Sequence, residues 1–194
     1  MDRVSQIVLS LLMLFVCTVN ASGASRSISG DVLTISGPFN SPDDLGLLGG
    51  NFWNDNPGLT KVRLDSSGGN EGVALFLAVG IGRHGLATRV EKGKTCAGAC
   101  MWVLLSGKTR SVDRLANITA VKSNIVDSGL AKAGGVDASN LAAGKQVSQW
   151  ANYIDPAVDK VALTIILGKA DAAKKGVYRL KPPDLYALGI DIGP

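Results

Sequence analysis

Hydrophobic and polar residues follow two different periods along this chain, and the two periods alternate. Short runs with the apolar pattern of strands lie at 31–37, 61–65, 88–91 and 118–122. Apolar residues spaced three and four apart predict helices at 71–84 and 97–106. This order of strand, helix, strand, helix and strand predicts an α/β fold with a mostly parallel sheet and right-handed crossovers.

Capping residues and helix breakers predict further elements on both sides of this pattern. Ser41 as N-cap, with Pro42 at the first helical position, predicts a helix that Gly49 and Gly50 weaken. Nearer the C-terminus the pattern predicts two helices, a strand and a short last helix, at 145–153, 156–167, 177–180 and 184–188. Residues 123–144 are rich in glycine, alanine and serine, and we expect a flexible insertion there.

The first 21 residues have the pattern of a secretory signal peptide. Arg3 precedes an apolar stretch of about 13 residues from Ile7 to Val19, and Ala21 completes a small-residue cleavage site. That stretch is shorter than the roughly 20 residues of a membrane-spanning helix, which is the alternative interpretation. We therefore expect a periplasmic or secreted protein with one domain over 22–194 and no membrane attachment after cleavage.

Composition and charge give no support for nucleic-acid binding. The chain has 20 Lys and Arg residues against 16 Asp and Glu residues, which gives a net charge of +4. The basic residues are scattered, with at most a doublet at Lys174 and Lys175, and aromatic residues make up only 5% of the chain. A nucleic-acid-binding surface needs clustered cations and aromatic side chains, so we do not expect this class of partner.

Two cysteines remain after the signal peptide, Cys96 and Cys100, four residues apart. In an oxidising compartment such a pair favours a disulfide, since residues four apart on a helix lie about 6 Å from each other. Two buried free thiols are the alternative. A metal site would need further ligands, and the chain holds a single histidine, His84, so we expect neither a metal nor a cofactor.

Two other motifs have structural explanations. Gly107-Lys108-Thr109 resembles the end of a phosphate-binding loop, but position 102, where that loop needs a glycine, is Trp102. His84 ends a predicted helix, where a cation interacts favourably with the helix dipole, and we prefer this interpretation to a catalytic role.

Five short motifs follow one another in a specific order and spacing. They lie at Leu64–Gly69, Gly85–Val90, Cys96–Cys100, Gly107–Arg110 and Pro183–Gly189. Together they resemble the ClpP/crotonase superfamily, and in particular the exported ClpP-like proteins of bacteria. In that family a Ser-Pro-Gly-Gly turn precedes a helix, a Cys-Ala-Ser-Ala-Cys motif carries the nucleophilic serine, and a histidine ends a later strand. The resemblance implies one domain built as a spiral of repeated ββα units, with a mostly parallel sheet and flanking helices.

The departures from the family pattern fall at the catalytic positions. Gly98 stands where the family has its serine, and Lys122 is the position that best matches the histidine. Serine catalysis needs a hydroxyl group and a base within hydrogen-bond reach, and Gly98 supplies no nucleophile. No position clearly matches the family's acidic residue, for which Asp127 and Asp155 are only candidates. The resemblance therefore implies a pseudoenzyme of the serine-peptidase group.

The part of the family site that binds a carbonyl oxygen has matching positions in this chain. Gly68 and Gly69 match the glycines whose backbone N–H groups form the oxyanion hole, and with Gly98 at a helix N-terminus they would bind a carbonyl or carboxylate group. The alternative is that turns and close packing require these glycines. We expect a binding or assembly protein with a peptide or protein partner, and the resemblance implies a homo-oligomer.

A second hypothesis is a hydrolase that uses a relocated nucleophile. The candidate nucleophiles are Ser66, Ser67, Ser106 and Ser123. Ser66 and Ser67 border the glycine turn, and Ser123 follows Lys122, although adjacent residues on a strand point to opposite faces. Acyl-CoA chemistry of the crotonase kind is a third option, but an exported protein would rarely meet coenzyme A.

Overall fold

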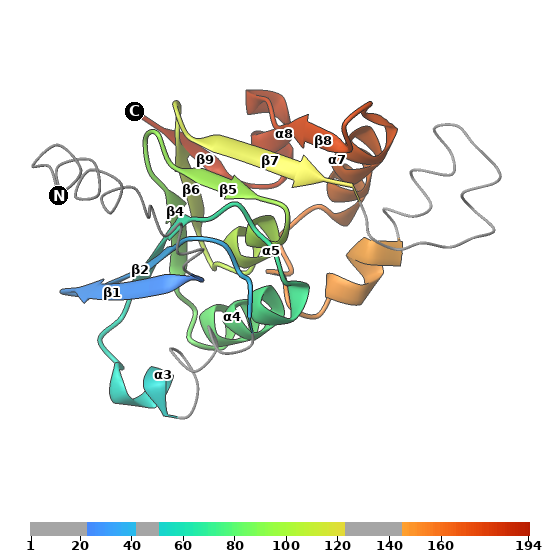
Figure 1. The fold of residues 1–194 in the computed structure, drawn as a ribbon. Coiled ribbons are helices and arrows are strands. Elements are labelled where there is room, and N and C mark those ends of the chain that lie inside the picture. Colours follow the sequence, from blue (N-terminus) through green and yellow to red (C-terminus); the bar gives the residue numbers. More distant parts are fainter. Residues whose placement is uncertain (1–22, 42–50, 123–144) are drawn as a thin grey trace, which may run out of the picture.

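The structure is a computed structural model, and it describes residues 23–41, 51–122 and 145–194. The signal peptide, most of the helix expected after Ser41, and the insertion expected at 123–144 lie outside these residues. The three described ranges form two sheets and a set of flanking helices (Figure 1).

The larger sheet has six strands, of which five are parallel. In spatial order they are β1 (Ser25–Ser29), β2 (Val32–Ser36), β3 (Lys61–Asp65), β4 (Ala87–Val90), β6 (Arg110–Asp113) and β9 (Asp191–Gly193). Only β1 runs antiparallel, as a hairpin partner of β2. Every residue of β1 is exposed. A strand rich in serine is tolerated here because it lies at the edge of the sheet.

The smaller sheet forms a second layer beside the first. It consists of β5 (Thr95–Ala97), β7 (Asn117–Val121) and β8 (Val177–Arg179), with β5 and β7 parallel and β8 antiparallel to β7. Isolated bridges join Ser66 to Cys96 and Phe39 to Gly69, so the turn after β3 continues this layer. Consecutive chain segments thus contribute one strand to each sheet before a helix, which is a ββα repeat.

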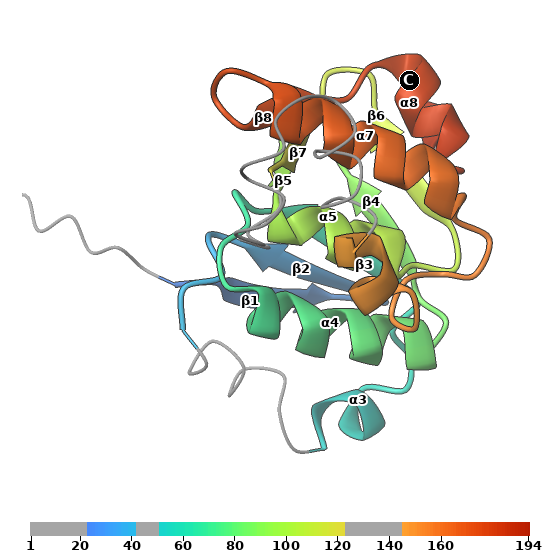
Figure 2. The same ribbon diagram turned by 90° about the vertical axis from the view of Figure 1, so that its right-hand side faces the viewer.

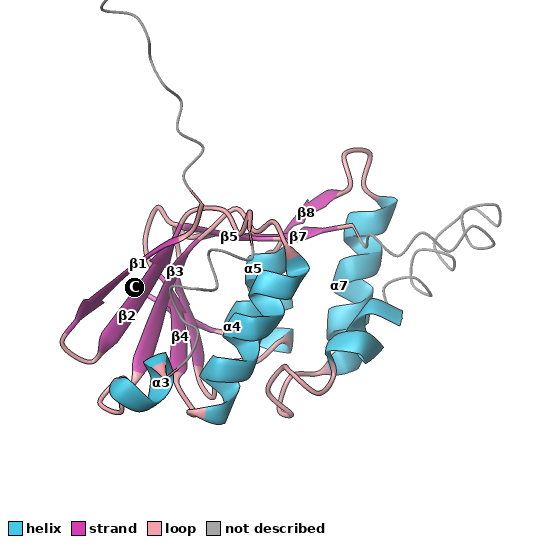
Figure 3. Cartoon of the chain, turned by 60° about the horizontal axis from the view of Figure 1, so that its bottom comes forward, coloured by secondary structure: helices cyan, strands magenta, loops and turns pink. Residues whose placement is uncertain are grey.

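Helices cover one side of the strands (Figure 3). They are α3 (Phe52–Asp55), α4 (Glu71–Arg83), α5 (Ala99–Leu105), α7 (Lys160–Ala172) and α8 (Pro182–Ala187), and residues 145–150 are also helical. In Figure 2, α5 lies between α4 and α7, and every one of its residues is buried. Trp102 of α5 stacks on Trp150 with ring centroids 4.9 Å apart. The buried α5 is therefore the central helix of the core.

The local sequence explains how α4 is placed. The side chain of Asn70 accepts hydrogen bonds from the backbone N–H groups of Gly72 and Val73, which caps the helix directly after the glycine turn. Val73, Ala74, Leu77, Ala78 and Ile81 then face the core at helical spacing. This face packs on α5, so the two helix N-termini lie close to the same turn.

The structure confirms the expected α/β fold with mostly parallel sheets and flanking helices, and it corrects several boundaries. The pattern predicted neither β1, β5, β6 nor β9, because these strands are short or polar. The helix expected at 156–167 begins at Lys160, because Asp159 is its N-cap and the carboxylate of Asp155 binds the N–H of Ala157 in a preceding turn. The helix expected at 145–153 is helical only to residue 150.

Candidate functional site

A cavity of about 220 Å³ lies where the turn after β3, the start of α5 and the end of β7 come together. Its lining residues are Ser67, Gly69, Glu71, Gly98, Ala99, Met101, Trp102, Val121, Lys122, Gln146 and Leu167. Three positions that the sequence singled out, Gly69, Gly98 and Lys122, are therefore brought together. Gly68 is adjacent in the chain but does not line the cavity.

Gly98 is the N-cap of α5 and has a backbone conformation that suits glycine. Its φ of 52° and ψ of −121° lie where residues with a side chain are strained, and its N–H donates to the carbonyl oxygen of Thr119 at 3.0 Å. A Cβ built at this position would lie 3.3 Å from Cγ2 of Val121. At the position expected for the nucleophile, the chain thus has only backbone atoms, next to the apolar side chain of Val121.

Two neighbouring residues at the end of β7, Val121 and Lys122, both line the cavity. Val121, and not Lys122, lies against Gly98, because neighbouring residues at the end of a strand point to opposite sides. Lys122 lines the same cavity, its N–H donates to the carbonyl oxygen of Gly176, and its aliphatic stem lies over that glycine. Lys122 therefore lines the cavity but is not the nearest neighbour of Gly98.

Close packing requires glycine at positions 68 and 69. A Cβ at Gly68 would overlap the carbonyl oxygen of Ala97, and one at Gly69 would overlap that of Phe39. The N–H of Gly68 already donates to Oγ of Ser66 at 3.1 Å. Among the described residues no acceptor is recorded for the N–H of Gly69, so Gly69 and not Gly68 has a donor available at the cavity.

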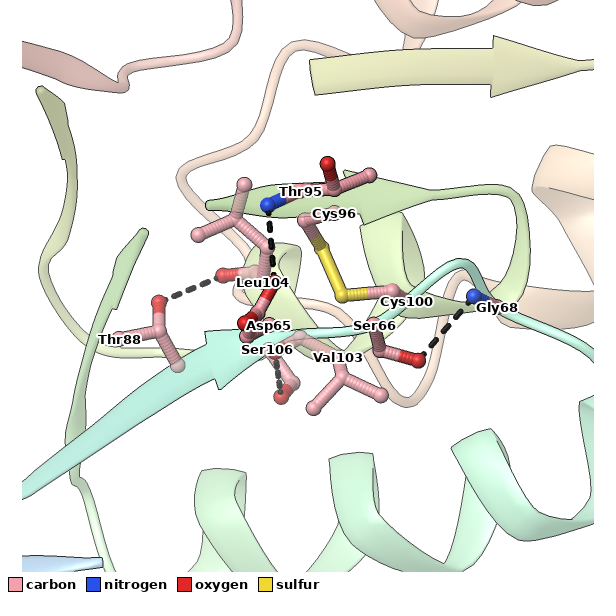
Figure 4. Close-up of a disulfide and its surroundings, with 10 residues drawn as sticks. All are labelled: Asp65, Ser66, Gly68, Thr88, Thr95, Cys96, Cys100, Val103, Leu104 and Ser106. Atoms are coloured by element: carbon pink, nitrogen blue, oxygen red, sulfur yellow. Dashed lines mark hydrogen bonds between the residues drawn. A yellow bond between two sulfur atoms is a disulfide. The ribbon is translucent and has the colours of Figure 1, made fainter. Parts of the chain in front are cut away.

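The disulfide between Cys96 and Cys100 holds the chain on both sides of Gly98 (Figure 4). Both cysteines are fully buried, and their Cα atoms are 5.2 Å apart. The bond joins β5 to the first turn of α5. It therefore fixes the direction in which the chain leaves the small sheet and enters the helix.

Asp65 fixes the other end of β5. Its carboxylate accepts hydrogen bonds from the N–H of Thr95 at 3.1 Å and from Nζ of Lys94 at 2.9 Å. Burial alone would raise the pKa of Asp65, but these hydrogen bonds and the charge of Lys94 outweigh it and hold the pKa below its ordinary value. The carboxylate thus remains charged and ties β3 to β5 next to the glycine turn (Figure 4).

A carboxylate–amide pair forms part of the cavity wall. Nε2 of Gln146 donates to Oε1 of Glu71 at 3.1 Å, and Gln146 is only 4% exposed. Oε1 of Gln146 is buried and has no hydrogen-bond partner among residues 23–41, 51–122 and 145–194. The sequence did not indicate Glu71, Ala99 or Gln146 as site residues. For Glu71 and Gln146 the reason is that no local pattern connects positions 71 and 146. Only the fold brings them together.

The candidate serines have different surroundings. Of the three candidate serines that the structure describes, Ser67 lines the cavity and the other two do not. Ser66 is buried, and its Oγ accepts a hydrogen bond from the N–H of Gly68 (Figure 4). Ser106 is also buried, and its Oγ donates to the carbonyl oxygen of Val103 at 2.8 Å. Ser123 lies outside the described residues. The hypothesis of a relocated nucleophile is therefore reduced to Ser67 within the described part of the chain.

The remaining candidates have structural contacts away from the cavity. Asp155 forms an ion pair with the buried Arg110 at 3.4 Å, and Asp127 lies outside the described residues. His84 is the C-cap of α4 and stacks on Trp53 with ring centroids 5.6 Å apart. Within residues 23–41, 51–122 and 145–194 no cluster of three or more potential metal ligands occurs, and no helix is long and apolar enough to cross a bilayer.

Comparison with known proteins identifies the fold. No protein-family model matches this chain, and no curated protein matches its sequence. Among solved structures, it is similar to DspI of Pseudomonas aeruginosa, with 10% identity, a TM-score of 0.51, and coverage of 92% of this chain and 71% of DspI. It is equally similar to an enoyl-CoA hydratase/isomerase family protein from Silicibacter pomeroyi, with 11% identity, a TM-score of 0.51, and coverage of 88% and 75%.

A further match is the 1510-N membrane protease specific for a stomatin homolog from Pyrococcus horikoshii, with 15% identity, a TM-score of 0.48, and coverage of 82% and 70%. At such identities a structural likeness shows the fold alone. The chain has a ClpP/crotonase-like fold, as the motifs implied.

Proposed function

We propose that this chain is an exported protein with a ClpP/crotonase-like fold that binds a small ligand and performs no serine-peptidase chemistry. The observation that carries the proposal is Gly98, which lines the cavity without a side chain and has Val121 as its nearest neighbour. A serine nucleophile needs a hydroxyl group and a base that removes its proton. Neither group is present at this position.

The groups that remain in the cavity favour binding of a carboxylate or carbonyl group. Lys122 supplies a cation, and Gly69 supplies a backbone N–H without a recorded acceptor in the described residues. A cation together with an N–H donor suits an anionic or strongly polar oxygen. Because α5 has only seven residues, we assign the binding to these two groups rather than to the dipole of the helix.

The alternative is a hydrolase that uses Ser67. Ser67 and Lys122 line the same cavity, and a lysine that has lost its proton can act as the base for a serine. No hydrogen bond between the two side chains is recorded in the described part of the chain. Binding is therefore the better supported function.

Hydrolysis assays distinguish the two functions. The mature protein is incubated with a panel of peptide and p-nitrophenyl ester substrates, and the Ser67→Ala variant serves as the matched control. We expect both proteins to give the rate of the buffer blank. Sustained turnover that the Ser67→Ala variant lacks would establish the alternative and overturn the proposal.

Export, a peptide or protein partner and a homo-oligomer belong to the same proposal. The apolar segment from Ile7 to Val19 supports export, and the family resemblance supports self-association. We do not propose nucleic-acid binding, because the cations are scattered along the chain.

A further inference from the structure

Two residues of opposite charge line the cavity. Glu71 and Lys122 both line it, but no ion pair between them is recorded among the described residues. Among the described residues, the amide of Gln146 donates to one carboxylate oxygen of Glu71, and the backbone N–H of Lys122 donates to Gly176. A ligand that complements this cavity therefore needs a positive group and a negative group of its own.

Gln146 adds an independent sign that a hydrogen-bond donor is missing from the cavity. Its Oε1 is buried and accepts no hydrogen bond from the described residues, which is unfavourable for a polar atom removed from water. The terminal torsion of a glutamine is soft, so the amide can turn its oxygen toward a donor in the cavity. A bound ammonium group next to Glu71 would supply the donor.

Apolar side chains form part of the remaining wall. Met101, Trp102 and Leu167 are almost fully buried, and Val121 closes the side next to Gly98. Such a wall favours an aliphatic group over a polar one because apolar surface is removed from water. The uncharged part of the ligand is therefore hydrophobic.

The volume limits the size of the ligand. At about 220 Å³ the cavity is smaller than the roughly 300–1,000 Å³ that holds a drug-sized molecule. It is equivalent to about seven water molecules at roughly 30 Å³ each. This space suits a single amino acid, and a folded peptide segment would have to extend beyond it.

We propose that the cavity binds a free apolar α-amino acid in its zwitterionic form, an inference that rests on the proposed binding function. The ammonium group lies against Glu71 and Gln146, the carboxylate lies against Lys122 and the N–H of Gly69, and the aliphatic side chain packs on the apolar wall. Opposite charges at two ends of the cavity fix the orientation of the ligand. Each of the three contacts is made by different residues, so each can be removed separately.

Isothermal titration calorimetry with three ligands tests this assignment. L-Leucine carries both charges, 4-methylpentanoate lacks the ammonium group, and 3-methylbutylamine lacks the carboxylate. We expect the mature protein to bind L-leucine at least tenfold more tightly than either analogue. L-Glutamate, whose side chain is charged, should bind at least tenfold more weakly than L-leucine because of the apolar wall.

Variants assign each end of the ligand to its residues. Glu71→Gln and Gln146→Met should weaken L-leucine at least fivefold and leave 4-methylpentanoate unchanged, whereas Lys122→Met should weaken both. The matched control is Lys160→Met, an exposed lysine on α7 that does not line the cavity, and it should change neither affinity. Unchanged thermal unfolding of the variants shows that they are folded.

The possible outcomes separate this inference from the proposed function. If 4-methylpentanoate binds as tightly as L-leucine, the amino-acid assignment is overturned while carboxylate binding without catalysis stands. Absence of L-leucine binding at millimolar concentration also overturns the assignment. Serine-dependent hydrolysis in the assays described above would overturn the proposed function itself.

Discussion

At Gly69 a missing side chain is a requirement of packing, because a Cβ there would overlap the carbonyl oxygen of Phe39. The φ of 126° adds backbone strain for any residue with a side chain. We predict that Gly69→Ala lowers the free energy of unfolding by more than about 2 kcal/mol, from the overlap and the strain together. Urea unfolding measures this loss.

The matched control for this prediction is Gly58→Ala. No atom lies within 4 Å of a Cβ at Gly58, so the substitution should change the free energy of unfolding by less than about 0.5 kcal/mol. Equal losses at positions 58 and 69 would show that the close approach to Phe39 is unimportant.

Gly98 differs from the other two glycines of the site. A Cβ at Gly98 would meet only the side chain of Val121, whereas Cβ atoms at Gly68 and Gly69 would meet backbone oxygens. Packing therefore does not forbid a serine at position 98, although its backbone conformation would carry strain of about 1–3 kcal/mol. The absence of a nucleophile is thus not a consequence of lack of space.

At the scale of the elements, the Cys96–Cys100 disulfide links β5 to α5 and contributes to the stability of the fold. Closing so short a loop should stabilise the fold by about 2 kcal/mol, if the entropy of the unfolded chain is the main term. We predict that a reducing agent lowers the free energy of unfolding by about this amount. The measurement is urea unfolding with and without reductant.

The control for the disulfide is the double variant Cys96→Ala, Cys100→Ala. Because it has no thiols at these positions, the reducing agent should leave its stability unchanged. A wild-type protein that is equally stable with and without reductant would contradict the prediction and favour two free thiols.

Asp184 connects α7, β8 and α8. Its carboxylate accepts hydrogen bonds from Lys169 and Tyr178, both at 2.8 Å, and from the N–H of Lys181 at 2.9 Å. Burial alone would raise the pKa of Asp184, but these contacts outweigh it and hold the pKa below its ordinary value of 3.8. The stabilisation is therefore complete above pH 3.8 and is lost as the pH falls through the lower folded-state pKa.

We predict that Asp184→Asn costs about 1–2 kcal/mol of unfolding free energy at pH 7, because charge-assisted hydrogen bonds are lost. The difference from the wild type should shrink as the pH is lowered below the ordinary aspartate value, since the wild-type carboxylate then gains a proton. Urea unfolding at pH 7 and at pH 2.5 measures both values. A difference that is the same at both pH values would contradict the assigned role.

How well the sequence predicts an element depends on its length and pattern. The helix α4 and the strand β3 have clear apolar periods and agree with their predicted ranges within one residue. Three-residue strands such as β5 have no room for a period, and their pairing depends on partners distant in the chain. The same reason explains which site residues the sequence predicts. Gly98 belongs to a recognisable motif, whereas Gln146 belongs to none.

The residues that line the cavity come from segments spread over the whole molecule. Its walls come from the turn after β3, the start of α5, the end of β7, the helical stretch 145–150 and α7. Successive ββα units place these segments side by side, although they are spread over a hundred residues of sequence (Figure 2). A change at one lining residue such as Gly98 therefore leaves the other walls in place, because they come from independent segments.

The proposed export concerns the whole chain and has its own test. We predict that protein recovered from the periplasm or the medium of an expressing bacterium begins at Ser22, because the signal peptide is removed after Ala21. Intact-mass measurement determines the first residue. Full-length chain retained in the membrane fraction would instead favour a membrane anchor.

The proposed function depends on a backbone that resembles a serine-peptidase site and has no nucleophile at position 98. The most direct measurement is the intact mass of the pure mature protein after incubation with a fluorophosphonate probe, with an active serine hydrolase as the reagent control. The proposed function predicts an unchanged mass, because Gly98 has no hydroxyl group and no basic side chain of the described residues forms a hydrogen bond with Ser67. Addition of one phosphonyl group per chain, located on Ser67 or another serine, would contradict it.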